Sequence, residues 1–153
     1  MKPLKFAALA MSGGLLPSHT SSPRLPLPYV IDLADMTAAK ELELNFAHRS
    51  GDVVGQITAV EITPTSVFVK GVVDRDTESA NLIRAGVAVG LPWEVSIEGT
   101  LKVRELIEAS EKVTLNGQQM QGPFFAFYEP KLTGLALCAR GADVGNVLVW
   151  EDA

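Results

Sequence analysis

The sequence has few of the residues that metal sites and disulfide frameworks need. The 153-residue chain contains one cysteine, Cys138, and two histidines, His19 and His48. A single cysteine cannot form an internal disulfide, so folding does not depend on an oxidising compartment. Neither histidine has a neighbour at the spacing of a metal-ligand motif, and the sequence therefore predicts no metal and no other cofactor.

Concentrated positive charge and long apolar runs are also missing. The net charge is −5, and lysine and arginine occur singly along the chain. Proteins that bind nucleic acid cluster positive charge to neutralise phosphates, so we expect no nucleic-acid partner. No apolar run approaches the roughly 18 residues that a membrane-spanning helix requires, so we expect no membrane partner.

Two common catalytic motifs are absent from the sequence. No glycine-rich turn leads from a strand into a helix with a following Lys-Ser or Lys-Thr, which argues against a phosphate-binding loop. No G-x-S-x-G elbow occurs, which argues against an α/β-hydrolase.

The first 28 residues are expected to form an extended arm or linker. Residues 12–28 contain two glycines and several prolines: Gly13, Gly14, Pro17, Pro23, Pro26 and Pro28. Such a segment forms neither a central strand nor a helix. The start, with Lys2 and Lys5 before an apolar stretch, has some character of a signal peptide, but the two glycines interrupt that stretch. We therefore place the folded domain at residues 29–153.

From residue 29 onward the chain consists mainly of short β-prone runs. They cover residues 29–33, 42–46, 53–62, 66–73, 93–99, 101–107, 112–115, 122–130, 132–139 and 146–150. A turn at 63–65 predicts a hairpin, and Asn116-Gly117 predicts a tight turn, because both residues tolerate positive φ. We expect an α+β domain, mostly an antiparallel β-barrel-like sheet with one or two helices.

One helix is expected after the run 66–73. Asp76 or Thr77 can cap its N-terminus, with Glu78 in the first turn. An apolar stripe follows at Ala80, Ile83 and Val87. Gly86 is predicted to end the helix by adopting a left-handed conformation.

The candidate chemistry that remains is a serine with a histidine. Ser96 lies in the run WEVSIEG, and His48 lies in NFAHRSGD, between a strand and a glycine-containing turn. The ordinary interpretation is a small polar residue on a strand and a solvated histidine. The functional interpretation is a nucleophile and its general base, because neutral imidazole can take the proton of a hydroxyl near physiological pH.

Three blocks of the sequence carry a resemblance to a known family. They are FAHRSGDVVGQI (46–57), SVFVKGVVDRDTESANLIRAGVAVGLPWEVSIEG (66–99) and KLTGLALCARGADVGNVLV (131–149). Residues 29–148 resemble the tailed-phage prohead (capsid maturation) proteases, serine proteases whose fold is similar to the herpesvirus assemblins. The order of histidine, helix and serine along the chain is that of the family.

The resemblance implies a function and a site. Ser96 takes the position of the nucleophile and His48 that of the base. Arg140, in CARGAD, lies in a glycine-containing turn whose backbone N–H groups are candidates for an oxyanion site. The implied partners are phage capsid and scaffold proteins and further copies of the chain. The implied location is the phage particle or procapsid, in the host cytoplasm during assembly.

The sequence departs from the family in three places. Glu98 stands where the family has glycine in its S-I-G strand, and Gly134 stands where the closing strand commonly carries a glutamate. No histidine follows Ser96, so the His-Ser-His set of the assemblins is impossible. Residues 96 and 98 of a strand share a face, which makes Glu98 a candidate third member. Its ordinary interpretation is a solvated strand carboxylate.

Two alternatives to an active serine endopeptidase therefore stay open. The chain can keep the protease fold with an incomplete triad and serve as a capsid-associated or scaffolding-related structural protein. It can also be a plain β-barrel binding module in which Ser96 and His48 are unrelated. The aromatic cluster Phe124, Phe125, Phe127 and Tyr128 is interpreted as core and barrel wall, with a hydrophobic substrate groove as the functional alternative.

Overall fold

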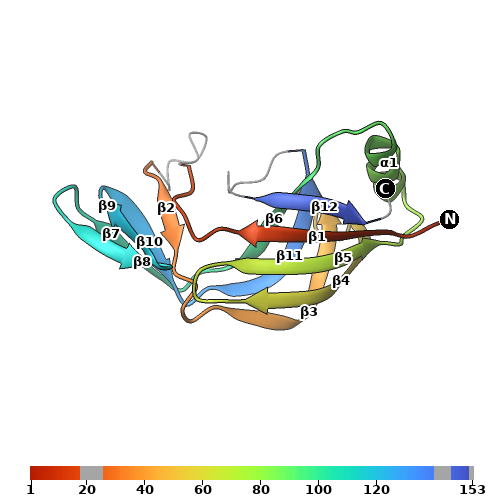
Figure 1. The fold of residues 1–153 in the computed structure, drawn as a ribbon. Coiled ribbons are helices and arrows are strands. Elements are labelled where there is room, and N and C mark those ends of the chain that lie inside the picture. Colours follow the sequence, from red (N-terminus) through yellow and green to blue (C-terminus); the bar gives the residue numbers. More distant parts are fainter. Residues whose placement is uncertain (18–25, 140–145, 152–153) are drawn as a thin grey trace.

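The computed structural model describes residues 1–17, 26–139 and 146–151. Within them the chain forms twelve strands and one helix (Figure 1). In chain order these are β1 (Leu4–Met11), β2 (Tyr29–Ile31), β3 (Thr37–Phe46), β4 (Val53–Ile62), β5 (Val67–Val73), α1 (Glu78–Ala88), β6 (Glu94–Thr100), β7 (Val103–Ile107), β8 (Lys112–Leu115), β9 (Gln118–Gln121), β10 (Phe124–Tyr128), β11 (Lys131–Cys138) and β12 (Val147–Glu151). The protein is thus mostly β, where the sequence predicted an α+β domain with one or two helices.

Seven strands form one curled sheet in the order β12-β1-β5-β4-β3-β11-β6. All neighbours are antiparallel except β3 and β11, which run parallel. The sheet curls into a half-barrel, so that β6 approaches β1 and β12 (Figure 1). The main core fills its inner side and includes the fully buried residues Phe6, Leu44, Val54, Leu135 and Leu137. The prediction of a mostly antiparallel, barrel-like sheet is confirmed, and the sheet closes to a half-barrel.

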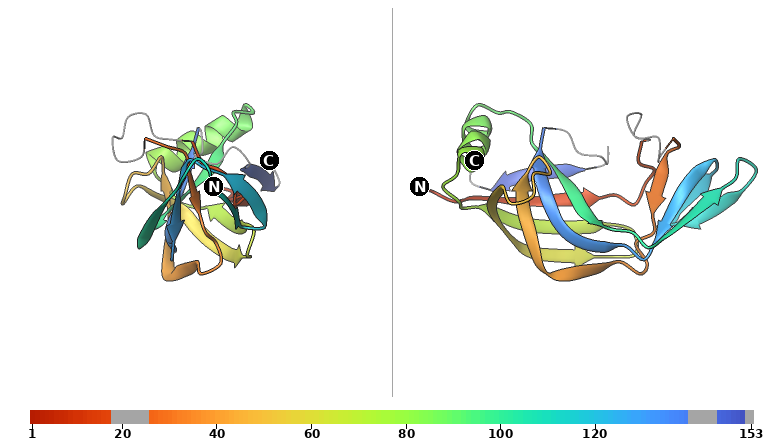
Figure 2. Two further views of the ribbon diagram at one scale, coloured as in Figure 1. Left: turned by 90° about the vertical axis from the view of Figure 1, so that its left-hand side faces the viewer. Right: turned by 180° about the vertical axis from the view of Figure 1, so that it is seen from behind.

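A second lobe projects from one end of the curled sheet, and α1 lies at the other end (Figure 2). The lobe contains the three-stranded sheet β2-β10-β7 and the hairpin β8-β9. It has a small core of its own, made by Val30, Ile107, Met120, Phe124 and Ala126. Phe124 therefore stabilises the lobe, as the core interpretation of the aromatic cluster predicted.

Strand β1 lies inside the segment that was expected to be an arm. It pairs with β12 on one side and β5 on the other, and Phe6 and Met11 are each 1% exposed. The arm prediction is therefore wrong for Leu4–Met11. The alanines of this strand have low β propensity, and the apolar alternation is weak, so only the pairing partners make the strand evident.

Helix α1 begins as predicted and ends later than predicted. Thr77 is the N-cap, and its hydroxyl accepts a hydrogen bond from the backbone N–H of Ala80. The helix continues through Gly86 to Ala88. A Cβ at position 86 would lie 2.8 Å from the indole nitrogen of Trp93, so the glycine permits close packing and does not end the helix. No helix in the described part of the chain is long and apolar enough to cross a membrane.

The predicted tight turn joins β8 to β9 and also attaches the lobe to the rest of the fold. Asn116 and Gly117 have φ values of 52° and 74°. The buried Asn116 side chain accepts a hydrogen bond from the N–H of Leu33 (2.8 Å). It donates to the carbonyls of Gly13 (2.9 Å) and Ile31 (2.8 Å). One amide thus links the β8–β9 turn to two other chain segments.

We expect Asn116→Ala to lower the free energy of unfolding by on the order of 3 kcal/mol, because three buried backbone groups lose their partner. Asn116→Gly keeps the positive φ accessible and separates the loss of the hydrogen bonds from backbone strain. Chemical denaturation of both variants measures the effect. Asn81→Ala on the exposed face of α1 is the control and should change stability by less than about 0.5 kcal/mol. An equally small change in both Asn116 variants would contradict the linking role.

Candidate active site

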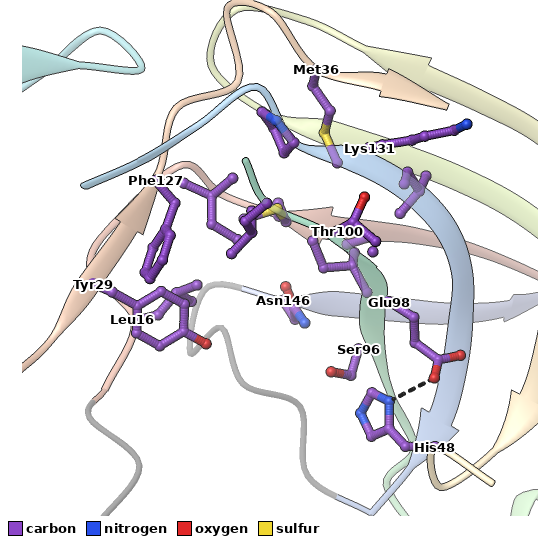
Figure 3. Close-up of a pocket in the computed structure, with 18 of the residues that line it drawn as sticks. Leu16, Tyr29, Met36, His48, Ser96, Glu98, Thr100, Phe127, Lys131 and Asn146 are labelled. Atoms are coloured by element: carbon purple, nitrogen blue, oxygen red, sulfur yellow. Dashed lines mark ion pairs between the residues drawn. The ribbon is translucent and has the colours of Figure 1, made fainter. Parts of the chain in front are cut away.

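A cavity of about 560 Å³ lies between β6 and the second lobe. Its apolar wall includes Met11, Leu16, Tyr29, Ile31, Met36, Leu101, Phe127 and Pro130. Polar residues gather at the end beside β6: His48, Ser96, Glu98 and Asn146 (Figure 3). Phe127 thus belongs to the cavity wall, so the aromatic cluster divides between the core of the lobe and the candidate site.

Ser96 lies in the middle of β6, the last strand of the curled sheet. It is opposite Ala136 of β11 and is 7% exposed. Its neighbour Val95 points to the other face of the sheet and is fully buried in the main core. The strand alternation therefore sends the serine to the outer face, where its hydroxyl meets the cavity.

His48 is carried by the turn that connects β3 to β4. Ala47 and His48 have φ values of 51° and 61°, and Gly51 has a φ of 83°. A left-handed conformation at non-glycine residues is uncommon and is held in place by its surroundings. Here the N–H of Ala47 donates to Leu137 of β11, and that of Arg49 donates to Phe46. The left-handed backbone at Ala47 and His48 thus sets where the His48 side chain lies.

Glu98 brings a carboxylate to the imidazole. His48 Nδ1 lies 3.3 Å from Glu98 Oε2, and the exposed fractions of the two side chains are 46% and 26% (Figure 3). Ser96 and Glu98 share one face of β6, as the strand geometry predicted. With Nδ1 facing the carboxylate, Nε2 is the nitrogen left to accept a proton. Among the described residues, no hydrogen bond joins Ser96 to His48, and both line the same cavity.

Two of the three departures from the resembled family, Glu98 and Gly134, face each other in the structure. Glu98 of β6 is directly opposite Gly134 of β11. A Cβ at position 134 would lie 3.4 Å from Glu98 Oε1 and 2.7 Å from the carbonyl oxygen of Glu43. Gly134 therefore leaves the space that the Glu98 carboxylate uses.

Three polar residues near the site were not singled out from the sequence. Asn146 was not singled out from the sequence; its amide donates to the carbonyl of Val95 and links the chain before β12 to β6. Asn45 and Glu43 of β3 were also missed, although the alternation of ELELNF places them on one face.

Arg140, the candidate for the oxyanion turn, lies outside the described residues. No group of three or more metal-ligating side chains occurs in the part of the chain that the structure describes.

Comparison with known proteins finds similarity in structure only. No protein-family model and no curated protein sequence matches the chain. The chain is similar to KSHV protease in complex with a hexapeptide phosphonate inhibitor, with 15% identity, a TM-score of 0.47, and coverage of 99% of this chain and 66% of that chain. It is also similar to varicella-zoster virus protease, with 19% identity, a TM-score of 0.46, and coverage of 99% and 65%. The chain spans just under two thirds of the length of each, and neither likeness identifies its activity.

Gly134→Ala tests the space beneath Glu98. The added methyl group would approach backbone that cannot easily move, so we expect a loss of stability of about 1–3 kcal/mol together with displacement of Glu98. Thermal unfolding measures the first effect, and the crystal structure of the variant measures the second. Gly14→Ala is the matched control, because its nearest neighbour is a side-chain atom 3.5 Å away. An unchanged Glu98 in Gly134→Ala would contradict the interpretation.

Proposed function

We propose that this chain is a serine endopeptidase in which Ser96 is the nucleophile, His48 the general base and Glu98 the residue that orients the base. The observation that carries the proposal is the 3.3 Å contact between His48 Nδ1 and Glu98 Oε2, made in the cavity that Ser96 lines. A serine hydroxyl is a weak nucleophile until a base removes its proton. A base held at one nitrogen by a carboxylate keeps the tautomer that this step requires.

The reaction follows from these positions. Ser96 Oγ attacks the carbonyl carbon of a peptide bond, and its proton passes to His48 Nε2. The imidazolium is stabilised by Glu98 and then gives that proton to the leaving amine. A water molecule, activated by the same imidazole, adds to the acyl-enzyme and releases the carboxylic acid while the proton returns to Ser96 Oγ. Side chains on two adjacent segments, β6 and the β3–β4 turn, supply all three groups.

The resemblance of the sequence extends the proposal to the capsid maturation class. In that class the substrates are phage scaffold and capsid proteins, the enzyme acts within the procapsid, and copies of the chain associate. The pairing of Glu98 with Gly134 supports the assignment, because the family's glutamate and glycine positions are exchanged between directly opposite residues. Exchange between opposite positions on two paired strands keeps a carboxylate in the same part of the site.

A second candidate function is a structural role for a protease fold with weakened chemistry. Two observations favour it: among the described residues no hydrogen bond joins Ser96 to His48, and the imidazole is nearly half exposed. A nucleophile and its base are commonly loosely arranged before substrate binds, so these observations are compatible with both candidates. The experiment below distinguishes them.

Covalent labelling of Ser96 tests the endopeptidase. We expect a serine-reactive phosphonate to add one equivalent to the wild-type protein, detected by intact-mass spectrometry, and to add none to Ser96→Ala. Co-expressed scaffold protein should be cut only by the wild type. His48→Asn is a useful companion, because asparagine tolerates the positive φ at this position and preserves the fold. A folded wild type that is neither labelled nor active on scaffold would favour the structural role.

Glu98→Gln tests the orienting carboxylate. Glutamine has nearly the same shape but carries no charge to stabilise the imidazolium and permits the wrong tautomer, so we expect labelling to slow by about 10²- to 10⁴-fold. Glu61→Gln, an exposed glutamate on β4, is the matched control and should label at the wild-type rate. Equal labelling rates for both variants would remove Glu98 from the site.

A further inference from the structure

Three adjacent strands place polar side chains in two rows beside the candidate site. In the first row, Asn45 of β3 and Ser96 of β6 lie on either side of Ala136 of β11. In the second, Glu43 and Glu98 lie on either side of Gly134. On this face β11 contributes only the methyl group of Ala136 and the hydrogen atom of Gly134. Side chains from β3 can therefore reach across β11 to those of β6.

Asn45 makes this crossing. Its Nδ2 donates to Glu98 Oε1 and also to Glu43 Oε1, at 2.5 and 3.2 Å. The two hydrogens of the amide thus separate two carboxylates that would otherwise repel each other. Because Glu98 uses its other oxygen for His48, the amide fixes the rotation of the carboxylate that faces the imidazole.

Glu43 connects the same network to the turn that carries His48. Its Oε1 accepts a hydrogen bond from the backbone N–H of Gly51 at 3.1 Å. The base and its carboxylate partner are therefore both attached to β3, one through the turn and one through Asn45. A shift of Asn45 would change the distance between His48 and Glu98.

Asn45 is poorly explained as a stabilising residue. It is 2% exposed, and its Oδ1 is buried with no hydrogen-bond partner among the described residues. A buried polar atom without a partner is unfavourable, and this cost offsets part of the stability that the two hydrogen bonds to carboxylates contribute. A buried amide with so small a net contribution that contacts a carboxylate of the site is expected to serve the site.

We propose that Asn45 is a positioning residue: it holds the Glu98 carboxylate against His48 and so sets the geometry of the base. The proposal rests on the proposed endopeptidase function for its effect on rate. The contact itself does not depend on that function.

Asn45→Leu tests the proposal, since leucine fills the same space and removes both donors. We expect the unfolding temperature to stay within a few degrees of wild type, because water can reach the partly exposed carboxylates. We expect the His48 Nδ1 proton to give a low-field NMR resonance in the wild type, because it faces Glu98, and to lose that resonance in Asn45→Leu. The maximal rate of phosphonate labelling should fall on the order of 10- to 100-fold, as for other residues that orient a functional histidine, with the half-saturating concentration unchanged. Asn81→Leu on α1 is the matched control.

The outcomes separate this proposal from the function on which it rests. A folded Asn45→Leu that keeps both the low-field resonance and the wild-type labelling rate overturns the positioning role. A wild type that is never labelled but loses the resonance in Asn45→Leu supports the positioning role and contradicts the endopeptidase. If Asn45→Leu does not fold, the side-chain amide resonances of Asn45 in Glu98→Gln decide. The Asn45 amide resonances should shift in Glu98→Gln and stay unchanged in Glu61→Gln. Resonances that do not shift in Glu98→Gln overturn the proposal.

Discussion

Strand β11 hydrogen-bonds to β3 on one side and to β6 on the other, in parallel and antiparallel directions respectively. The fully buried inward-facing residues of these three strands are Leu44, Leu135, Leu137 and Val95, and their burial fixes the register of all three. A slip by one residue would move this apolar set to the outer face and would move the serine and both glutamates to the inner face. Burial of the inner face therefore determines which side chains meet on the outer one.

The second lobe depends on contacts with the rest of the fold for its position, and it forms a wall of the cavity. Its hairpin turn is attached through Asn116 to backbone at Gly13, Ile31 and Leu33. These three residues belong to two chain segments, which lead directly to the cavity residues Leu16 and Tyr29. The polar end of the cavity is thus built by the curled sheet, and much of its apolar wall by segments that this amide holds together.

Local features could be predicted from the sequence, and features that require strand pairing could not. The hairpin of β4 and β5, the Thr77 cap and the turn at Asn116 all depend on nearby residues. The joint placement of Ser96 and Glu98 on one face follows from strand alternation alone. Strand β1 and Asn45 depend on partners distant in the chain. The contact of Asn45 with Glu98 crosses β11, and nothing local in the sequence specifies the parallel register that makes it possible.

Several locally unfavourable features lie together around His48. Ala47 and His48 have left-handed backbone, Asn45 buries an oxygen without a partner, and Glu43 and Glu98 converge on one amide. Each feature is expected to lower stability, and residues of ordinary preference would remove it. Left-handed backbone at non-glycine residues also occurs at Asn116, whose amide has a structural role, and at Glu129. Around His48 such features coincide with the strands that place one imidazole against one carboxylate, beside a serine in an apolar cavity, as is expected where geometry has been selected at the expense of stability.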